Sequence, residues 1–473
     1  MKKAISGLYW VTGAQYISTV IRFIGGIYLA RTIDPVFFGQ QGLVLSVSML
    51  VWSFTMIGEE PALLKKQDDV DNYMQTLLFI RIIIVCFLVA AMVFLWSVGW
   101  LPGSSDIKNY IIIIFLLQAF TQVGAIYMAN IQKLMFFRRL ALYSLAPNVI
   151  AISLACLLAF LGYKIWALLW LIIAEQLVQV ILIILLSPKI FLPKFNKPLA
   201  LEFFHFSKYV ASSNLLDRFH CQIDKITVGS LIGERPLGFY QRAYSIGGLM
   251  QSVLTGGLST IVQPYFAKMQ EHRDKFGEKF ELLSSLLIRV SCAFYICLAF
   301  ILPEAIKLVY GEKWILTVPL FRLLLPFAIL HGFRVILRNT HHVAGSVKLL
   351  ARAQIIETLT LLILLYPLIY WKGIVGVPFA VNISFIVGVS MMLYYLKQYA
   401  DFSIRKIFVN PLISSLVAAV IAWWFKFAVS SEFGDILNIG TVIVIFFFSY
   451  VITLLLLEYS YIKKTVSMFI RDS

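Results

Sequence analysis

Hydrophobic positions in this 473-residue chain form long blocks that short polar connections separate. An α-helix needs about 20 mostly apolar residues to cross a bilayer. Fourteen blocks are long enough, which predicts fourteen membrane-spanning helices. We place the spans at 8–30, 40–62, 74–98, 107–131, 142–161, 165–187, 209–232, 240–262, 282–302, 319–338, 353–371, 374–396, 409–429 and 436–458. The tenth is the hardest to delimit, because Arg322, His331 and Arg334 interrupt it.

Composition supports this pattern. Hydrophobic residues make up 60% of the chain, charged residues 14%, and the mean hydropathy is +0.87. Such a balance excludes a soluble globular protein and predicts an all-α polytopic membrane protein. The net charge of +16 would suggest nucleic acid in a soluble chain. In a membrane protein it reflects basic cytoplasmic loops and attraction to anionic membrane lipid, so we expect no nucleic-acid partner.

The cysteines, histidines and glycine motifs of the sequence predict no cofactor. The five cysteines lie inside apolar blocks and form no CxxC, so no disulfide framework is expected. His331, His341 and His342 have no carboxylate or Cys at ligand spacing, so we predict no metal site. No G-x-x-x-x-G-K-[ST] segment occurs, and the chain is therefore not expected to be its own ATPase.

Lysine and arginine concentrate on alternate connections, and the richer side is expected to be cytoplasmic. Both termini then lie inside the cell, in agreement with an even number of spans. The first apolar block runs on to Ala30 without a convincing cleavage site, so we expect it to remain as an uncleaved span.

The two halves of the chain resemble each other. Segment 29–40 (LARTIDPVFFGQ) aligns with 228–239 (VGSLIGERPLGF) at an offset of 199, which sets Gly39 against Gly238. Segment 162–168 aligns with 371–377 at an offset of 209. Both offsets join loops on the same side of the membrane, which predicts a parallel repeat of six spans and alternating access through a central cleft. The predicted division is an N-lobe at 1–187, a cytoplasmic linker with a short interfacial helix at 188–207, a C-lobe at 208–398, and two appended spans with a tail at 399–473.

The seventh span carries an unusual number of charges. Asp217, Arg218, Asp224 and Lys225 lie within nine residues, and the two carboxylates are about 10 Å apart along a helix. Charges at that depth are costly unless they face protein or water. Two interpretations stay open: an ion pair that locks two helices together, or a helix that lines a polar pathway.

The repeat makes span one equivalent to span seven, and span one contains a lone Arg22. Arg81 and Arg289 lie near the inner surface, and we expect their side chains to extend to it. The predicted cleft cations are Arg22, Arg218, Lys225, Arg322 and Arg334. Candidate coupling residues are the acids Asp217, Asp224 and Glu357.

Several short motifs resemble those of a known family. Residues 30–39 (ARTIDPVFFG) are similar to the "AR-x-L-G-P-x-x-F/Y-G" turn of bacterial polysaccharide translocases, with Asp34 where Gly is usual. Residues 224–229 (DKITVG) and 237–244 (LGFYQRAY) resemble that family's "D-x-x-x-x-G … L-G-x-Y-x-x-A" signature. Pro264 and the turn at 310–314 (YGEKW) follow in the family's order. On these residues the chain is identified as a member of the Wzx-type oligosaccharide flippases, within the superfamily of multidrug extruders and lipid II flippases.

The resemblance implies a V-shaped bundle of two lobes in a bacterial inner membrane. It further implies the flipping of an undecaprenyl-diphosphate-linked glycan for surface polysaccharide synthesis, with a polysaccharide polymerase and a chain-length regulator as further partners. Fixed cations suit a diphosphate cargo. A cation-coupled exporter of small drugs is the alternative, although it would need an acidic cleft. A membrane glycosyltransferase or polymerase would need a site outside the bilayer, and the outer loops are short.

Overall fold

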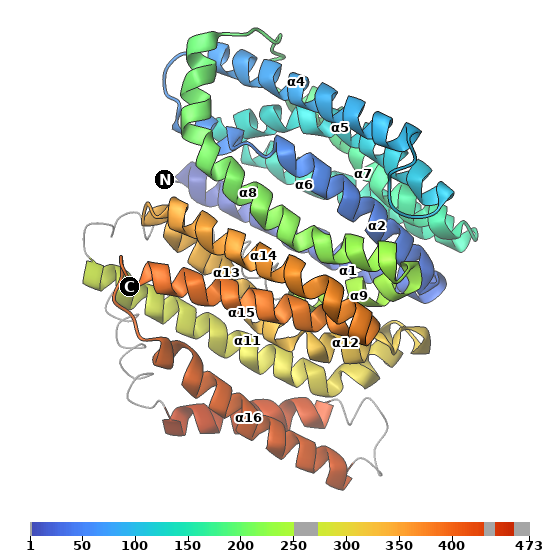
Figure 1. The fold of residues 1–473 in the computed structure, drawn as a ribbon, viewed down its shortest axis with the longest axis vertical. Coiled ribbons are helices and arrows are strands. Elements are labelled where there is room, and N and C mark those ends of the chain that lie inside the picture. The colour runs from blue at the N-terminus through green and yellow to red at the C-terminus, as the bar shows by residue number, and fades with distance from the viewer. Residues whose placement is uncertain (1, 250–272, 430–439, 458–473) are drawn as a thin grey trace. The chain divides into compact units, whose positions relative to one another are not determined.

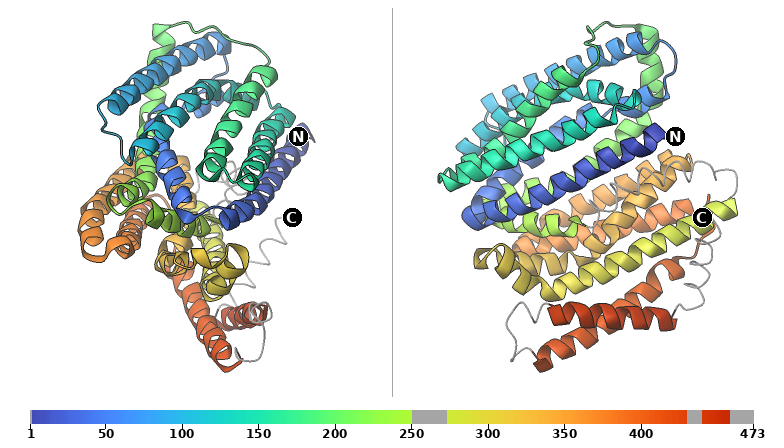
Figure 2. Two further views of the ribbon diagram at one scale, coloured as in Figure 1. Left: turned by 90° about the vertical axis from the view of Figure 1, so that its right-hand side faces the viewer. Right: turned by 180° about the vertical axis from the view of Figure 1, so that it is seen from behind.

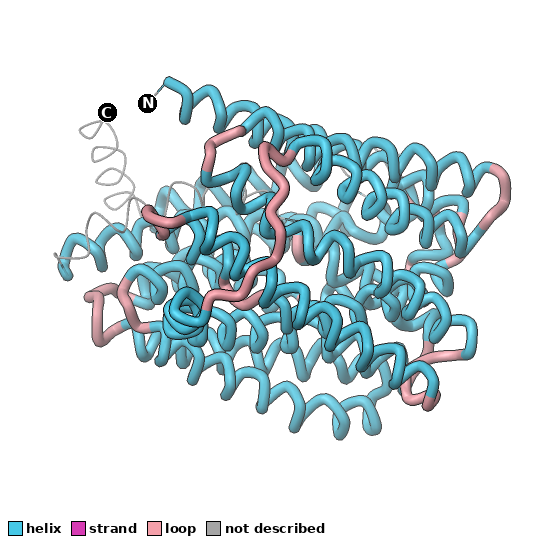
Figure 3. The backbone as a smooth tube through the Cα atoms, turned by 90° about the horizontal axis from the view of Figure 1, so that it is seen from above, coloured by secondary structure: helices cyan, strands magenta, loops and turns pink. Residues whose placement is uncertain are grey.

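Helices make up nearly all of the computed structural model, which describes residues 2–249, 273–429 and 440–457. No β-strand occurs in these three ranges (Figure 3). The chain divides into two compact units, residues 1–241 and 242–473, and the boundary falls inside helix α9. The predicted all-α class is confirmed.

Unit 1 contains eight whole helices and the first half of a ninth. Helix α1 packs against α6, and α6 packs against α7 (Figure 2). Helix α2 packs against α5 and α8. The helices are α1 Lys2–Thr32, α2 Pro35–Trp52, α3 Glu59–Lys65, α4 Val70–Ser97, α5 Ser105–Lys133, α6 Phe137–Phe160, α7 Lys164–Leu186, α8 Lys197–Leu231 and α9 Glu234–Gly247.

Unit 2 is built around α11, which packs against α13 and α16. A hydrophobic cluster that includes Cys297, Ala418 and Phe446 joins α11 to α16 and to the last described helix, Gly440–Leu457. The other helices are α11 Arg273–Val309, α12 Thr317–Leu323, α13 Leu325–Val343, α14 Val347–Lys372, α15 Gly376–Leu396 and α16 Ile404–Val429.

The number of spans differs from the prediction. Among the described residues, nine helical segments are long and apolar enough to cross a membrane, or ten if one bent pair is counted. Helices α1 and α8 have 31 and 35 residues but are not among the nine, because polar residues interrupt their apolar sequence. Most of the predicted span 240–262 lies outside the described residues. The count of fourteen is therefore not confirmed.

The boundaries of the predicted lobes stay a prediction. Residues 188–196 are not helical, whereas α8 is continuous from Lys197 to Leu231 and changes direction near its start (Figure 1). The predicted interfacial helix is thus the first part of α8. The packing of α8 against α2 groups it with unit 1 in this structure.

The turn between α1 and α2 shows how the local sequence sets a helix start. The Asp34 carboxylate accepts a hydrogen bond from the Val36 N–H at 3.0 Å, and Pro35 occupies the first helical position. A short polar side chain at this position satisfies a backbone donor that the helix itself leaves unpaired. Proline at the first position loses no helical hydrogen bond. Asp34 therefore begins α2.

The hard-to-delimit tenth span is a bent pair. Helices α12 and α13 meet at an angle of 63°, and Pro326 lies in the first turn of α13. The Asn382 side chain on α15 donates to the Leu323 carbonyl at 2.6 Å and accepts from the Phe327 N–H at 3.1 Å. A broken helix in a membrane needs such partners, because lipid offers its backbone none.

We predict that Asn382→Leu destabilises unit 2, since it leaves the Leu323 carbonyl and the Phe327 N–H without their side-chain partner. The free energy of unfolding should fall by about 1–3 kcal/mol. This loss should appear as a lower midpoint temperature of thermal unfolding in detergent. Ile383→Ala, at the neighbouring exposed position, is the matched control. A midpoint equal to that of the parent protein would contradict this role for Asn382.

Candidate functional site

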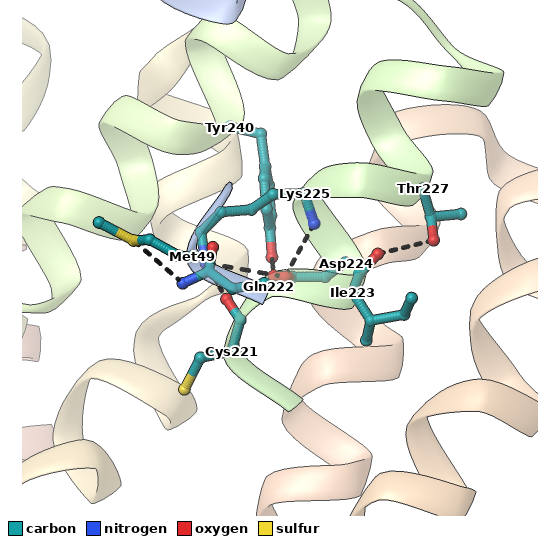
Figure 4. A network of polar contacts seen from close by, with 8 residues as sticks. All are labelled: Met49, Cys221, Gln222, Ile223, Asp224, Lys225, Thr227 and Tyr240. Atoms are coloured by element: carbon teal, nitrogen blue, oxygen red, sulfur yellow. Dashed lines mark hydrogen bonds and ion pairs between the residues drawn. The ribbon is translucent and has the colours of Figure 1, made fainter. Parts of the chain in front are cut away.

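Asp224 and Lys225 on α8 form the centre of a buried polar network (Figure 4). Asp224 is 1% exposed and Lys225 is 6% exposed. The Tyr240 hydroxyl on α9 donates to Asp224 Oδ2 at 2.6 Å, and the Lys225 N–H donates to Oδ1 at 2.8 Å. The Lys225 ammonium lies 3.7 Å from Asp224 Oδ1 and donates to the Cys221 carbonyl. The ammonium is thus turned toward its own helix.

The other two charged residues of segment 217–225 lie in different surroundings. Arg218 is exposed, whereas Asp217 is partly buried. The structure therefore divides the four charged residues of segment 217–225 between a buried cluster and a more accessible position about two turns earlier. The buried ion pair lies within α8, and it is the Tyr240 hydroxyl that joins Asp224 to α9. That this helix lines a polar pathway stays a prediction.

Arg22 on α1 is held by two other helices. Its Nε donates to the Asn148 side chain on α6, and its Nη2 pairs with the Glu175 carboxylate on α7. Its side chain is nevertheless 52% exposed. Among the described residues, no hydrogen bond engages Nη1. The guanidinium is therefore oriented by protein while one edge stays available.

A polar stripe continues from Arg22 along α1. Gln15 and Thr19 are both exposed, and helical spacing places all three side chains on one face. Polar side chains on a spanning helix are costly against lipid, so such a stripe indicates a polar cavity or a protein partner.

In unit 2, Arg334 and Glu357 form a buried ion pair between α13 and α14. Arg334 Nη2 is 3.0 Å from Glu357 Oε2, and the two side chains are 5% and 0% exposed. A Cβ atom added to Gly388 on α15 would lie 2.5 Å from the Glu357 carboxyl carbon. Gly388 therefore leaves room for the carboxylate. Arg322 on α12 is exposed, and its Nε donates to the Ala299 carbonyl at 3.1 Å.

The sequence interpretation missed a further buried pair. Arg81 on α4 is 5% exposed, so the expectation that it extends to the membrane surface is wrong. Its Nη2 lies 2.5 Å from Glu59 on α3, and its Nη1 donates to the Thr55 carbonyl at 2.7 Å. Helix α2 ends just before Thr55, so Arg81 satisfies a carbonyl at the break. The Gly58-Glu59-Glu60-Pro61 sequence was the available signal.

The histidines and acids offer no metal site among the described residues. His341 is buried, with Nδ1 2.7 Å from Ser346 Oγ and Nε2 3.0 Å from the Met392 carbonyl. Nδ1 thus contacts the turn between α13 and α14, and Nε2 contacts α15.

These helices and charges define a polytopic membrane protein with a transporter fold. A solved structure of the lipid II flippase MurJ, in an inward closed conformation, matches with a TM-score of 0.76 at 15% identity and covers 95% of this chain and 98% of that one. An inward-facing multidrug transporter of the MATE family matches with a TM-score of 0.60 at 13% identity, over 81% of this chain and 94% of that one.

The sequence comparisons then give the family. The protein-family model described as "Polysaccharide biosynthesis protein" matches residues 28–319, and the chain belongs to that family. The teichuronic acid biosynthesis protein TuaB of Bacillus subtilis is 24% identical, over 68% of each chain. The lipopolysaccharide biosynthesis protein WzxC of Escherichia coli is 22% identical, over 75% of this chain and 71% of its own. The resemblance drawn from the motifs is confirmed.

We predict that Arg334→Met lowers the stability of unit 2 by about 3–5 kcal/mol, because it leaves the Glu357 charge buried without its partner. The double variant Arg334→Met with Glu357→Leu should recover most of that loss. Unfolding in detergent measures both. If the double variant is no more stable than Arg334→Met, the ion pair is not the cause.

Proposed function

We propose that this protein is a flippase that moves an undecaprenyl-diphosphate-linked oligosaccharide from the cytoplasmic to the periplasmic leaflet of a bacterial inner membrane. Both termini are then cytoplasmic. The glycan would serve cell-surface polysaccharide synthesis, with a polymerase and a chain-length regulator as downstream partners. The protein transports and catalyses no covalent step.

The observation that carries the proposal is the half-exposed Arg22 on the polar face of α1. Asn148 and Glu175 orient its guanidinium, and Nη1 stays available to donate hydrogen bonds to an anionic ligand. An arginine N–H donated to a phosphate oxygen is a strong, charge-assisted hydrogen bond. The Gln15 amide and the Thr19 hydroxyl suit the hydroxyl groups of a sugar. Membership of the polysaccharide biosynthesis family supports the same cargo.

A multidrug exporter is the second candidate, because the MATE transporter shares the fold. The exposed charged residues argue against it. Arg22, Arg218 and Arg322 are exposed and positive, whereas Asp224 and Glu357 are buried in ion pairs. A cationic drug would meet like charge at these positions.

We predict that Arg22→Ala and Arg218→Ala each slow flipping about tenfold, as expected from the loss of one hydrogen bond to a charged group. The measurement uses purified protein in liposomes with a fluorescent undecaprenyl-diphosphate-linked N-acetylglucosamine, whose inner-leaflet pool is protected from dithionite. Arg22→Lys should be milder than Arg22→Ala, because it keeps the charge.

Arg138→Ala provides the control, since Arg138 is exposed at the start of α6 and stacks on Trp10. Flipping at the parent's rate in both alanine variants would remove these residues from the pathway. Parent protein that moves the probe no faster than empty liposomes do would overturn the proposed function. Export of a cationic dye by those same liposomes would favour the second candidate.

We further propose that Asp224 couples flipping to a proton gradient by taking up a proton in one arrangement of its surroundings. The Asp224→Asn variant keeps an oxygen that can accept from Tyr240. We predict that it still flips the probe but no longer responds to an imposed pH gradient. A response equal to the parent's, or loss of folded protein from the membrane, would assign Asp224 a structural role instead.

A further inference from the structure

Helix α1 carries a second stripe beside the polar one that leads to Arg22. Tyr9, Tyr16 and Phe23 recur every seven residues, and helical spacing places them on one line along the axis. Their exposed fractions are 75%, 50% and 48%. We call these three residues the aromatic track.

The aromatic track lies between two other kinds of surface. On a helix of 3.6 residues per turn, one neighbouring stripe is the polar one. The stripe on the other side is aliphatic and contains Ile17, Val20 and Ile24, which are 52%, 55% and 62% exposed. Helix α1 therefore changes from polar to aromatic to aliphatic around its axis, and the aliphatic stripe is the part that suits hydrocarbon.

Depth in the membrane does not account for the track. Aromatic residues of an interfacial belt gather near the level of the lipid headgroups. The track instead runs about 21 Å along the axis, at 1.5 Å per residue. Tyr16 lies near the middle of α1, and no hydrogen bond from the described residues engages its hydroxyl. A phenol hydroxyl against hydrocarbon is costly, so the track indicates a polar ligand.

Sugar rings have the chemistry that this surface fits. One face of a pyranose ring presents C–H groups, which lie favourably on the negative face of an aromatic ring. The sugar hydroxyls project from the ring edge, where the Gln15 amide and the Thr19 hydroxyl of the polar stripe can bond them. Successive members of the track are about 10 Å apart along the axis, which is about the length of two linked sugar rings.

We propose that the aromatic track binds the glycan of the cargo by stacking, with Arg22 holding the diphosphate beside Phe23. The inference rests on the proposed function and names the part of the cargo that each residue meets. The track runs only toward the N-terminus, because the position seven residues after Phe23 is the buried Ala30. The first sugar then lies at Phe23, the third at Tyr16 and the fifth at Tyr9.

The first experiment varies the length of the glycan. The probes are fluorescent undecaprenyl diphosphates that carry no sugar, or one, three or five β-1,4-linked N-acetylglucosamine residues, at low concentration in the liposome assay. Phe23→Leu should slow every probe that carries sugar. Tyr16→Leu should slow only the three- and five-sugar probes, and Tyr9→Leu only the five-sugar probe. The expected loss is about two- to tenfold, the range for one aromatic contact.

Two further variants serve as controls. Ile17→Ala changes a similarly exposed position on the aliphatic stripe and should leave the rates of all four probes at the parent's values. Tyr16→Phe keeps the ring and should stay close to the parent. Flipping of the sugar-free probe shows that each leucine variant is folded. Equal slowing of all four probes by the leucine variants, or slowing of none, would overturn the track.

The second experiment detects the sugar without transport. Val20→Cys, in a background with the five native cysteines replaced by alanine, puts a thiol between Tyr16 and Phe23 at the edge of the track. We expect a free N-acetylglucosamine pentamer to slow its reaction with a maleimide several-fold in detergent. Ile17→Cys is the matched control, because it is similarly exposed but lies further from the track. Its reaction should not change.

The two experiments separate this inference from the proposed function. A parent protein that moves none of the four probes counts against flipping, whereas the maleimide reaction still tests the track. Slowed reaction at both cysteine positions, or at neither, would overturn sugar binding on the track. Flipping of all four probes without any dependence on the three rings would overturn the track and leave the proposed function standing.

Discussion

The hydrocarbon core of a membrane contains no water to solvate an ionised side chain. This constraint determines how the helices of each unit can be arranged. A charge in a spanning helix needs an opposite charge, a backbone partner or a polar cavity. In three buried ion pairs each charge has an opposite charge as its partner: Glu59 with Arg81, Asp224 with Lys225, and Glu357 with Arg334. Two of these pairs join different helices. Removing either partner would leave its mate charged in a nonpolar interior, so the pairs restrict which helices can be neighbours.

The sequence located these charges but not most of their partners. Helical spacing relates residues on one helix, and it therefore placed Asp224 beside Lys225. Partners on other helices depend on packing, which a linear pattern does not contain. Asn148, which orients Arg22, is an ordinary amide in an apolar block, and Glu59 follows a short break that hydropathy does not reveal. Arg81 was misplaced for the same reason, since without Glu59 the membrane surface was its nearest partner.

Backbone breaks limited the fold prediction in a similar way. Apolar blocks predicted the class and most of the spans, because block length follows from bilayer thickness. They could not show that α2 stops at Trp52 or that α12 and α13 bend. Each break is stabilised from a distant helix, by Arg81 at Thr55 and by Asn382 at Leu323 and Phe327. Pro326 indicated one break, but the side chain that makes the break tolerable lies 56 residues further along the chain.

Exposure divides the cations that the sequence treated as one group. Lys225 and Arg334 are buried against carboxylates, and for either to bind a diphosphate it would have to leave that carboxylate uncompensated, at a cost of about 3–5 kcal/mol. Arg22, Arg218 and Arg322 are exposed and carry no such penalty. Arg22 has the further advantage that Asn148 and Glu175 already fix its geometry, so less side-chain entropy is lost when an anion binds. Under the proposed function, recognition of an anionic cargo therefore falls to the exposed arginines, while Lys225 and Arg334 stay with their carboxylates.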